Sequence, residues 1–313
     1  CRLQQLMLGL LLTGLSGRLW AQELQQDGKI VNGTTAKQGE FPFAVSSLFL
    51  YTLYKIMPIF FLLLQLSLRR VKSGSHSCGA SLLNSGWAMT AAHCVRGATP
   101  AQLNLQYGSN KLRRNATQLA AIAAIYVHPD YQPQDKHMND IALLQLQLPL
   151  NFNELVQPVR LPQPQQPTLG NTSVVLVGWG LNAASYTQTG GVVQKHLQKV
   201  ELQVFSDEDC SNRHQTQLFD TQLCAGVPEG GKGQCSGDSG GPLLLAGTDT
   251  QVGIVSWSIK PCTRPPYPGV FTEVSAYVDW IVKLVGSTAK SVPTSQLWIQ
   301  QLLVGRQPPP ALP

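Results

Sequence analysis

Short apolar or alternating runs recur along this chain, and turn-forming residues separate them. Runs such as FAVS, CGASLL, WAMT, IALLQL and VGIVSW are bounded by Gly, Asn or Pro. Runs of this length with regular turn signals predict β-strands, and they favour a barrel or a sandwich over a helical fold. The pattern therefore predicts an all-β protein.

Two segments carry helix signals instead. One begins at Ser206, where Asp209 completes a capping-box pattern. The other is predicted to be capped by Ser275 and to end at Gly286. Its apolar positions fall on one face, as in an amphipathic helix: Val278, Ile281, Val282 and Val285. The Pro-rich residues 286–313 are predicted to form a disordered C-terminal tail.

One apolar stretch does not fit the strand pattern. Residues 47–67 are almost wholly apolar, yet Lys55 and Pro58 interrupt them. A membrane-spanning helix does not place a charge and a proline near its centre, and a soluble barrel does not expose so large an apolar patch. We therefore expect these 21 residues to be translated intron sequence that the mature protein lacks. The alternative is a loop that docks the protein on a membrane surface.

The N-terminal residues have the features of a secretory signal peptide. Arg2 precedes an apolar run from Leu6 to Leu15, and the small Ala21 ends a predicted signal peptide of residues 1–21. The run is too short to span a membrane. A polar segment, residues 22–29, follows, and we expect a secreted, extracellular protein. Three Asn-X-Ser/Thr triplets are candidate glycosylation sites that agree with export: Asn32, Asn115 and Asn171.

Cysteine usage and charge narrow the function classes. Removal of the signal peptide takes away Cys1 and leaves six of the seven cysteines, an even number for an oxidising compartment. None of them forms a CxxC pair, so we expect no metal site, and the spacing alone leaves the disulfide connectivity open. The net charge of +6 is not gathered in any Lys/Arg run, so no nucleic-acid partner is expected. No cofactor motif occurs.

Three residues with hydrolytic chemistry follow one another in the order His93, Asp140, Ser239. They lie in TAAHC, after the predicted strand WAMT, in NDIALL, and in GDSGGP before the apolar run PLLL. Acyl transfer at a peptide bond needs a nucleophile, a base, an anion that orients the base, and donors for the developing oxyanion. The glycines around Gly237 allow the tight turn that points backbone N–H groups at an oxyanion.

Six motifs together resemble the chymotrypsin-type family of secreted serine endopeptidases: IVNG, TAAHC, NDIALL, GWG, GDSGGP and SW. The resemblance covers about residues 30–285, the predicted protease domain. It implies two six-stranded antiparallel β-barrels with the active site in the cleft between them. It also implies that His93 is general base and then acid, that Asp140 orients it, and that Ser239 attacks. The N–H groups of Gly237 and Ser239 would form the oxyanion hole.

The same resemblance assigns the cysteines and an activation step. It implies the disulfides Cys78–Cys94, Cys210–Cys224 and Cys235–Cys262. Cleavage after Lys29, in DGKIVNG, would free the ammonium of Ile30 to pair with Asp238, because a buried carboxylate needs such a partner. The expected partners are therefore protein or peptide substrates, an activating trypsin-like protease and protein inhibitors. We expect a monomer.

The expected specificity depends on three pocket positions that the resemblance assigns. Gly233 stands where trypsin-like relatives carry an aspartate, so a Lys or Arg side chain would enter the pocket unpaired. Gly269 would leave the pocket open towards its base, and Ser258 would narrow its entrance slightly. We therefore predict a preference for large apolar residues (Phe, Tyr, Leu) before the scissile bond, with an elastase-like preference for smaller aliphatic residues as the alternative.

A catalytically inactive homologue that serves as a binding module is the alternative from another functional class. The presence of His93, Asp140 and Ser239 together favours an active enzyme.

Overall fold

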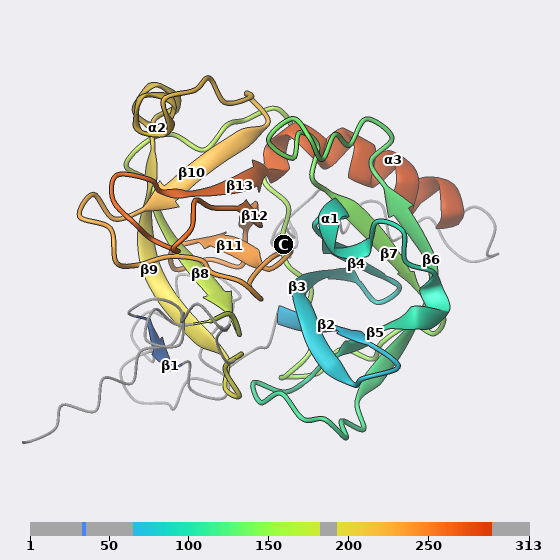
Figure 1. Ribbon diagram of the computed structural model, residues 1–313. Coiled ribbons are helices and arrows are strands. Elements are labelled where there is room, and N and C mark those ends of the chain that lie inside the picture. The colour runs from blue at the N-terminus through green and yellow to red at the C-terminus, as the bar shows by residue number, and fades with distance from the viewer. Residues whose placement is uncertain (1–32, 36–64, 182–192, 290–313) are drawn as a thin grey trace, which may run out of the picture.

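Two β-barrels lie side by side in the computed structural model, which describes residues 33–35, 65–181 and 193–289 (Figure 1). Six strands close the first barrel in the order β2-β3-β4-β7-β6-β5. These strands are β2 (Gln65–Arg70), β3 (Ser75–Asn84), β4 (Trp87–Thr90), β5 (Leu103–Gln106), β6 (Leu119–Val127) and β7 (Ala142–Leu146). Every pairing between them is antiparallel.

The second barrel also closes with six strands, in the order β9-β10-β13-β12-β11-β8, because β8 pairs with β9. Its strands are β8 (Ser173–Gly178), β9 (Gln198–Phe205), β10 (Gln222–Gly226), β11 (Pro242–Leu245), β12 (Gln251–Trp257) and β13 (Gly269–Glu273). The short β1 (Thr34–Thr35) adds to β9 from outside. The prediction of two six-stranded antiparallel barrels is confirmed.

Alternation of apolar and polar residues explains how the strands face the barrel cores. In β9, Val200, Leu202 and Val204 are buried, while Glu201 and Gln203 between them are exposed. Successive side chains of a strand point to opposite faces, so this pattern turns one face inward. Each large apolar side chain that is fully buried contributes about 1.5–3 kcal/mol to the free energy of unfolding.

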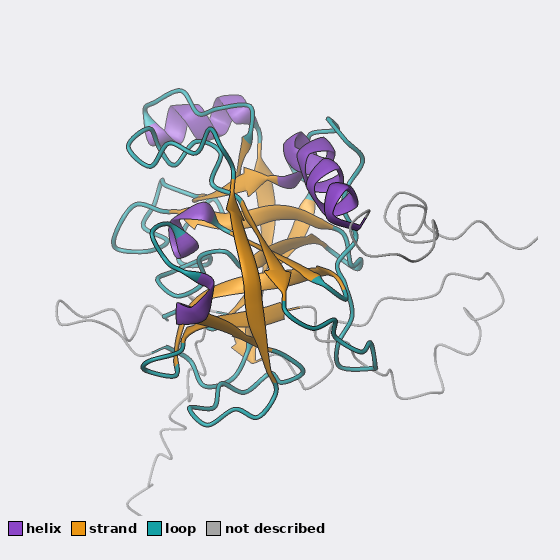
Figure 2. Cartoon of the chain, turned by 90° about the vertical axis from the view of Figure 1, so that its right-hand side faces the viewer, coloured by secondary structure: helices purple, strands orange, loops and turns teal. Residues whose placement is uncertain are grey.

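Helices and short helical turns lie outside the strands (Figure 2). They are α1 (Ala92–Val95), α2 (Asp207–His214), α3 (Val278–Ala289) and the 3-10 turns η1 (Pro100–Gln102) and η3 (Val274–Tyr277). The helix start predicted at Ser206 is confirmed, because Ser206 Oγ accepts a hydrogen bond of 3.1 Å from the Asp209 N–H. No helix in the described part of the chain is both long and apolar enough to cross a bilayer.

The last helix differs from its prediction at both ends. Ser275 does not cap α3, because it lies inside the 3-10 turn and its hydroxyl donates to Glu273 Oε1 at 3.1 Å. The helix also continues through Gly286 to Ala289, so the predicted tail begins later than residue 286. The rest of that tail, residues 290–313, lies outside the described residues.

Strand β2 changes the boundary of the apolar stretch. Gln65, Leu66 and Ser67, which were expected to belong to the insertion at 47–67, form the first half of this barrel strand. Leu66 is 1% exposed, and Ser67 pairs with Gly79 of β3. Residues 47–64 lie outside the described part, as do the predicted signal peptide and the segment 22–29.

Three disulfides have the connectivity that the family resemblance implies, Cys78–Cys94, Cys210–Cys224 and Cys235–Cys262. They join β3 to α1, α2 to β10, and the loop before β11 to the loop before β13. Of the glycosylation candidates, Asn115 and Asn171 lie in exposed loops, and Asn32 lies outside the described residues.

Candidate active site

His93 and Asp140 are neighbours in space, at the ends of two paired strands of the first barrel. His93 lies in α1, directly after β4, and Asp140 lies just before β7, the strand that pairs with β4. Asp140 Oδ2 is 2.7 Å from His93 Nδ1, and Asp140 Oδ1 accepts a hydrogen bond of 2.9 Å from the His93 backbone N–H. Two hydrogen bonds to one carboxylate fix both the position and the tautomer of the imidazole.

The carboxyl group of Asp140 stays ionised although it is fully buried. Burial by itself raises the pKa of Asp140, but hydrogen bonds from His93 and Ser256, together with the charge of His93, hold it below its ordinary value. Ser256 Oγ donates to Asp140 Oδ2 at 2.6 Å. The sequence singled out Ser256 only as part of the SW motif, and its contact with Asp140 crosses from one barrel to the other.

Ser239 faces the same cleft from the second barrel. The cleft has a volume of about 380 Å³, and its lining includes His93, Gly237, Ser239 and Trp257. Strand β3 of the first barrel holds the loop in place, because the Gly79 N–H donates to the carbonyl oxygen of Ser239 at 2.7 Å. The structure thus brings together the three residues that lie far apart in the sequence.

His76 ties the two barrels together beside this loop. Its Nε2 donates to the Gly237 carbonyl oxygen at 2.8 Å, and its Nδ1 is 2.8 Å from Ser67 Oγ. Burial lowers the pKa of His76 to about 4, so the ring is neutral and Nδ1 accepts the hydroxyl proton of Ser67. Sequence reasoning missed His76, because nothing in SHSC distinguishes it from an ordinary strand residue.

Asp238 is buried beneath the serine loop. Its carboxylate accepts hydrogen bonds from the Gly180 N–H at 2.7 Å and from the Cys235 N–H at 2.9 Å. Burial raises the pKa of Asp238 to about 6, although these N–H groups and the charge of Lys260 oppose the shift. A Cβ atom at Gly178 or Gly180 would overlap this carboxylate, which explains both glycines of the GWG motif.

Comparison with known proteins decides the family. A model of the family described as Trypsin matches residues 63–281. The chain belongs to the trypsin family of serine endopeptidases.

Relatives within the trypsin family cover most of the chain. It is 39% identical over 262 residues to trypsin-1 of Astacus astacus, which covers 80% of this chain and 98% of that protein. It is 37% identical over 223 residues to kallikrein 1-related peptidase b27 of Mus musculus, with 67% of this chain and 81% of the peptidase covered. Identity to transmembrane protease serine 9 of Rattus norvegicus is 36% over 258 residues, which covers 81% of this chain but 21% of that longer protein.

The pocket next to Ser239 departs from the trypsin-family pattern that the sequence suggested. Gln234 sends its side chain across the pocket, where Nε2 donates to the carbonyl oxygens of Trp257 at 2.6 Å and Val270 at 3.2 Å. A Cβ atom at Gly269 would lie 2.9 Å from Gln234 Cδ, so the glutamine fills the space that Gly269 leaves.

The residues that line the cleft agree with a pocket whose base is filled by Gln234. Gln234 and Ser258 line the cleft, whereas Gly233 and Gly269 do not. The backbone at Gly233 has φ +147°, in the range that favours glycine. The sequence does not reveal this position of Gln234, because the direction of its side chain depends on carbonyl groups from two other strands, β12 and β13.

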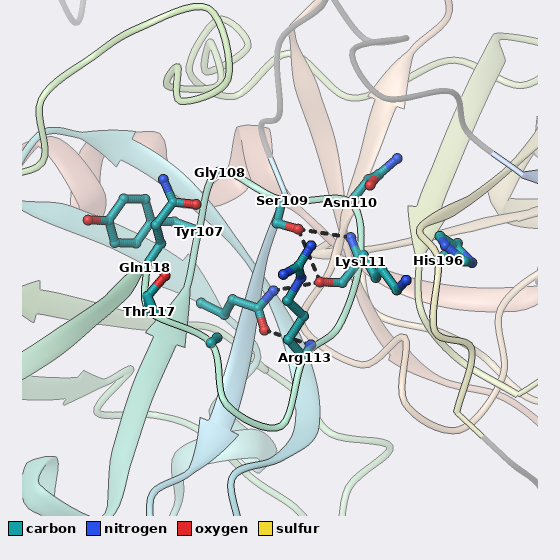
Figure 3. A pocket seen from close by; sticks show the side chains of 11 residues that line it. Tyr107, Gly108, Ser109, Asn110, Lys111, Arg113, Thr117, Gln118 and His196 are labelled. Carbon is teal, nitrogen blue, oxygen red and sulfur yellow. Dashed lines mark hydrogen bonds between the residues drawn. The ribbon is translucent and has the colours of Figure 1, made fainter.

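A second hollow of about 460 Å³ lies where the first barrel meets the strand β9, and contains none of the predicted catalytic residues (Figure 3). Lys111, Arg113 and His196 line it, without any Asp or Glu. Residues 65–129 hold seven Lys or Arg and no Asp or Glu. This segment therefore carries an excess of positive charge into the first barrel, although its basic residues form no continuous run.

Proposed function

We propose that this trypsin-family protein is a secreted serine endopeptidase, made as a precursor, that hydrolyses peptide bonds through an acyl-enzyme. One observation carries the proposal: His93, already bonded to the ionised Asp140, shares a cleft with Ser239. The first barrel supplies the base and its orienting anion, and the second supplies the nucleophile. The complete set also speaks against an inactive homologue that only binds.

Each group has one role in this scheme. Ser239 Oγ attacks the scissile carbonyl carbon while His93 Nε2 takes its proton, and His93 then gives that proton to the leaving amine. Water hydrolyses the ester by the same route in reverse. The N–H groups of Gly237 and Ser239 stabilise the oxyanion, and the φ of +98° at Gly237 supports that tight turn.

Activation is the second part of the proposal. Cleavage after Lys29 would give Ile30 a free ammonium group. Asp238 is a buried carboxyl group that forms no ion pair within the described part of the chain, although the charge of Lys260 acts on it. An ion pair there would fix the loop that carries Gly237 and Ser239. Lys29 and Ile30 lie outside the described residues, so this pairing rests on the sequence and on the surroundings of Asp238.

The proposed specificity is for small uncharged residues before the scissile bond. The absence of a carboxylate at Gly233 argues against Lys and Arg. The sequence favoured Phe, Tyr and Leu because Gly269 would leave the pocket open, but Gln234 occupies that space. The contacts of Gln234 therefore support the alternative, an elastase-like preference for smaller aliphatic residues such as Ala and Val.

Two measurements test these parts separately. Ser239→Ala in the activated chain is expected to lower the rate of peptide hydrolysis by several orders of magnitude while leaving the folded state intact. A variant that keeps most of its activity would refute the assignment of the nucleophile.

For specificity, peptides that differ only in the residue before the scissile bond are compared by kcat/KM. Gln234→Ser is expected to raise kcat/KM for Phe relative to Ala by about 10-fold or more, because it reopens the base of the pocket. Ser258→Gly, which widens only the entrance, is the matched control and should change this ratio less. A wild-type preference for Phe that Gln234→Ser leaves unchanged would refute the role of Gln234.

A further inference from the structure

A second imidazole faces the proposed catalytic base. The rings of His137 and His93 are edge-to-face with centroids 5.4 Å apart. One ligand atom from each of His93, His137 and Asp140 lies within 4.8 Å of the other two. We propose that His93 and His137 form a binding site for a zinc-class divalent metal ion, and that the bound ion reversibly inhibits the enzyme. This inference rests on the proposed function, because inhibition requires His93 to act as the base.

The outer partners of the two rings suit metal binding. His93 Nδ1 is bonded to Asp140 Oδ2 at 2.7 Å, and His137 Nδ1 is 2.9 Å from the hydroxyl of Tyr131. Imidazoles that bind metals usually engage their other nitrogen in this way, which fixes the tautomer and the ring orientation. Both rings are therefore left with Nε2 as the nitrogen that can offer a lone pair.

Each Nε2 is open to an ion. Among the described residues, His137 Nε2 has no hydrogen-bond partner, and the contact of His93 Nε2 is with the disulfide sulfur of Cys94 at 3.7 Å. Zinc binds imidazole nitrogen at about 2.0–2.1 Å in tetrahedral geometry, so two ligands on one ion stand a little over 3 Å apart. One ligand atom of each ring lies within 4.8 Å of the other, so the two rings have to approach further before one ion binds both, with water completing the shell.

The backbone holds His137 in a conformation that few residues adopt. Lys136, His137 and Asn139 have φ values of 46°, 55° and 59°, in the left-handed region. Such conformations persist where the surroundings hold them, and they cluster at functional sites. Here Tyr277 donates to Asn139 Oδ1 at 2.7 Å, and the Gln132 N–H donates to the Met138 carbonyl oxygen at 2.9 Å. These contacts fix the loop between β6 and β7, which places the His137 ring edge-to-face with that of His93.

Two other groups of cysteine and histidine do not offer the same chemistry. They are Cys78, His93 and Cys94, and Cys210, His214 and Cys224. Their cysteines are joined in disulfides, so no thiolate is present to bind a metal. The pair His93 and His137 instead offers Nε2 of each ring, and the sequence shows no sign of the pair because His137 shares no motif with His93.

A metal ion at this site would inhibit catalysis, because it would occupy the lone pair of His93 Nε2. His93 Nε2 must accept the proton of Ser239, and a metal ion on that nitrogen takes the same lone pair. Mg²⁺ and Ca²⁺ prefer oxygen ligands, so a nitrogen site of this kind selects zinc-class ions.

Zinc titration of the activated enzyme tests the inference. Zn²⁺ is expected to abolish hydrolysis of a short peptide substrate, a chelator to restore it, and Mg²⁺ to have no effect. His137→Ala should keep activity without metal and raise the half-inhibitory zinc concentration at least about 10-fold. Tyr131→Phe, which removes the outer partner of His137, should raise it by about 10-fold. His196→Ala, at the second hollow, is the matched control and should leave inhibition unchanged.

Calorimetry separates this inference from the proposed function. Zinc binding is measured on the full chain with Ser239→Ala, which needs no activity, and again with His137→Ala added. Binding of one ion that the second change abolishes supports the site even if hydrolysis fails to depend on Ser239. Equal zinc binding with and without His137, or inhibition that His137→Ala does not relieve, would overturn it.

Discussion

A buried carboxyl group in the first barrel and one in the second have pKa values shifted in opposite directions. Asp140, at the mouth of β7 in the first barrel, has a pKa below its ordinary value, because the contacts with His93 and Ser256 outweigh the effect of burial. Glu273, at the end of β13 in the second barrel, has its pKa raised to about 7 by burial. Thr168 and Ser275 donate hydrogen bonds to Glu273, yet they do not reverse the shift.

The difference shows that hydrogen bonds alone do not keep a buried carboxylate ionised here. Asp140 faces an imidazole that can carry a positive charge, whereas Glu273 faces hydroxyl and amide groups. Asp238 is an intermediate case: two backbone N–H donors and the charge of Lys260, which forms no ion pair with it, leave its pKa raised to about 6. The cationic partner therefore decides between the two outcomes, and the same rule links the proposed triad to the proposed activation step.

Asp140→Asn gives the largest expected effect, because it removes the ionised carboxylate that holds His93 in place. We expect kcat to fall by about 10⁴-fold, the order of loss known when the triad carboxylate of a serine protease is neutralised. Activity is measured on a short peptide after activation. Asp249→Asn, which breaks the ion pair with Arg160, is the matched control. A loss of less than 10-fold, against about 10⁴-fold expected, would contradict the role of Asp140.

Lys29→Gln tests whether Asp238 depends on a cation from outside the second barrel. Without cleavage, Ile30 has no free ammonium, and ionised Asp238 stays unpaired. A pKa raised to about 6 corresponds to a penalty of about 100-fold in an equilibrium constant. We therefore expect trypsin-treated Lys29→Gln to be about 100-fold less active than the treated wild type. N-terminal sequencing should find the active wild type beginning at Ile30, and full activity of the intact precursor would refute the idea.

Glu273→Gln tests the second barrel through stability. The pKa of Glu273 is raised from 4.5 to about 7 in the folded chain, so the folded state holds this proton more tightly than the unfolded state. Its contribution is fully present below pH 4.5 and is lost as the pH rises to about 7. The loss in the free energy of unfolding is about 3 kcal/mol, and Glu273→Gln should remove that slope. Denaturant unfolding between these pH values measures it, and an unchanged slope would contradict the assignment.

Ser256→Ala should have the smallest effect on activity of these variants, because Asp140 loses one hydrogen bond but keeps its contacts with His93. A hydrogen bond to a charged group contributes about 1.5–3 kcal/mol, so we expect kcat to fall by about 10-fold with little change in KM. Steady-state kinetics with Ser73→Ala, an exposed turn serine, as control would measure it. Unaltered kcat would show that Asp140 does not need its contact across the barrels.

The short alternating strands, the capped start of α2 and the grouping of His93, Asp140 and Ser239 could be predicted from the sequence. Strand alternation and helix caps are local, since each depends on neighbours within a few residues. The triad and the disulfide pairs are not local in this sense, and they were predicted from the resemblance of the motifs to the family. The end of α3 and the start of β2 could not be predicted, because packing on a barrel decides where such elements begin and end.

What the sequence determined by itself was the set of chemical groups: a histidine, an aspartate and a serine in fixed motifs, and a pocket position, Gly233, without a carboxylate. Tertiary structure alone decided how these groups are supported. The direction of Gln234 depends on the carbonyls of Trp257 and Val270. Likewise, the loop between β6 and β7 brings the ring of His137 edge-to-face with that of His93 in α1. Contacts between residues remote in the chain carry no local sequence pattern, so only the closed barrels bring them together.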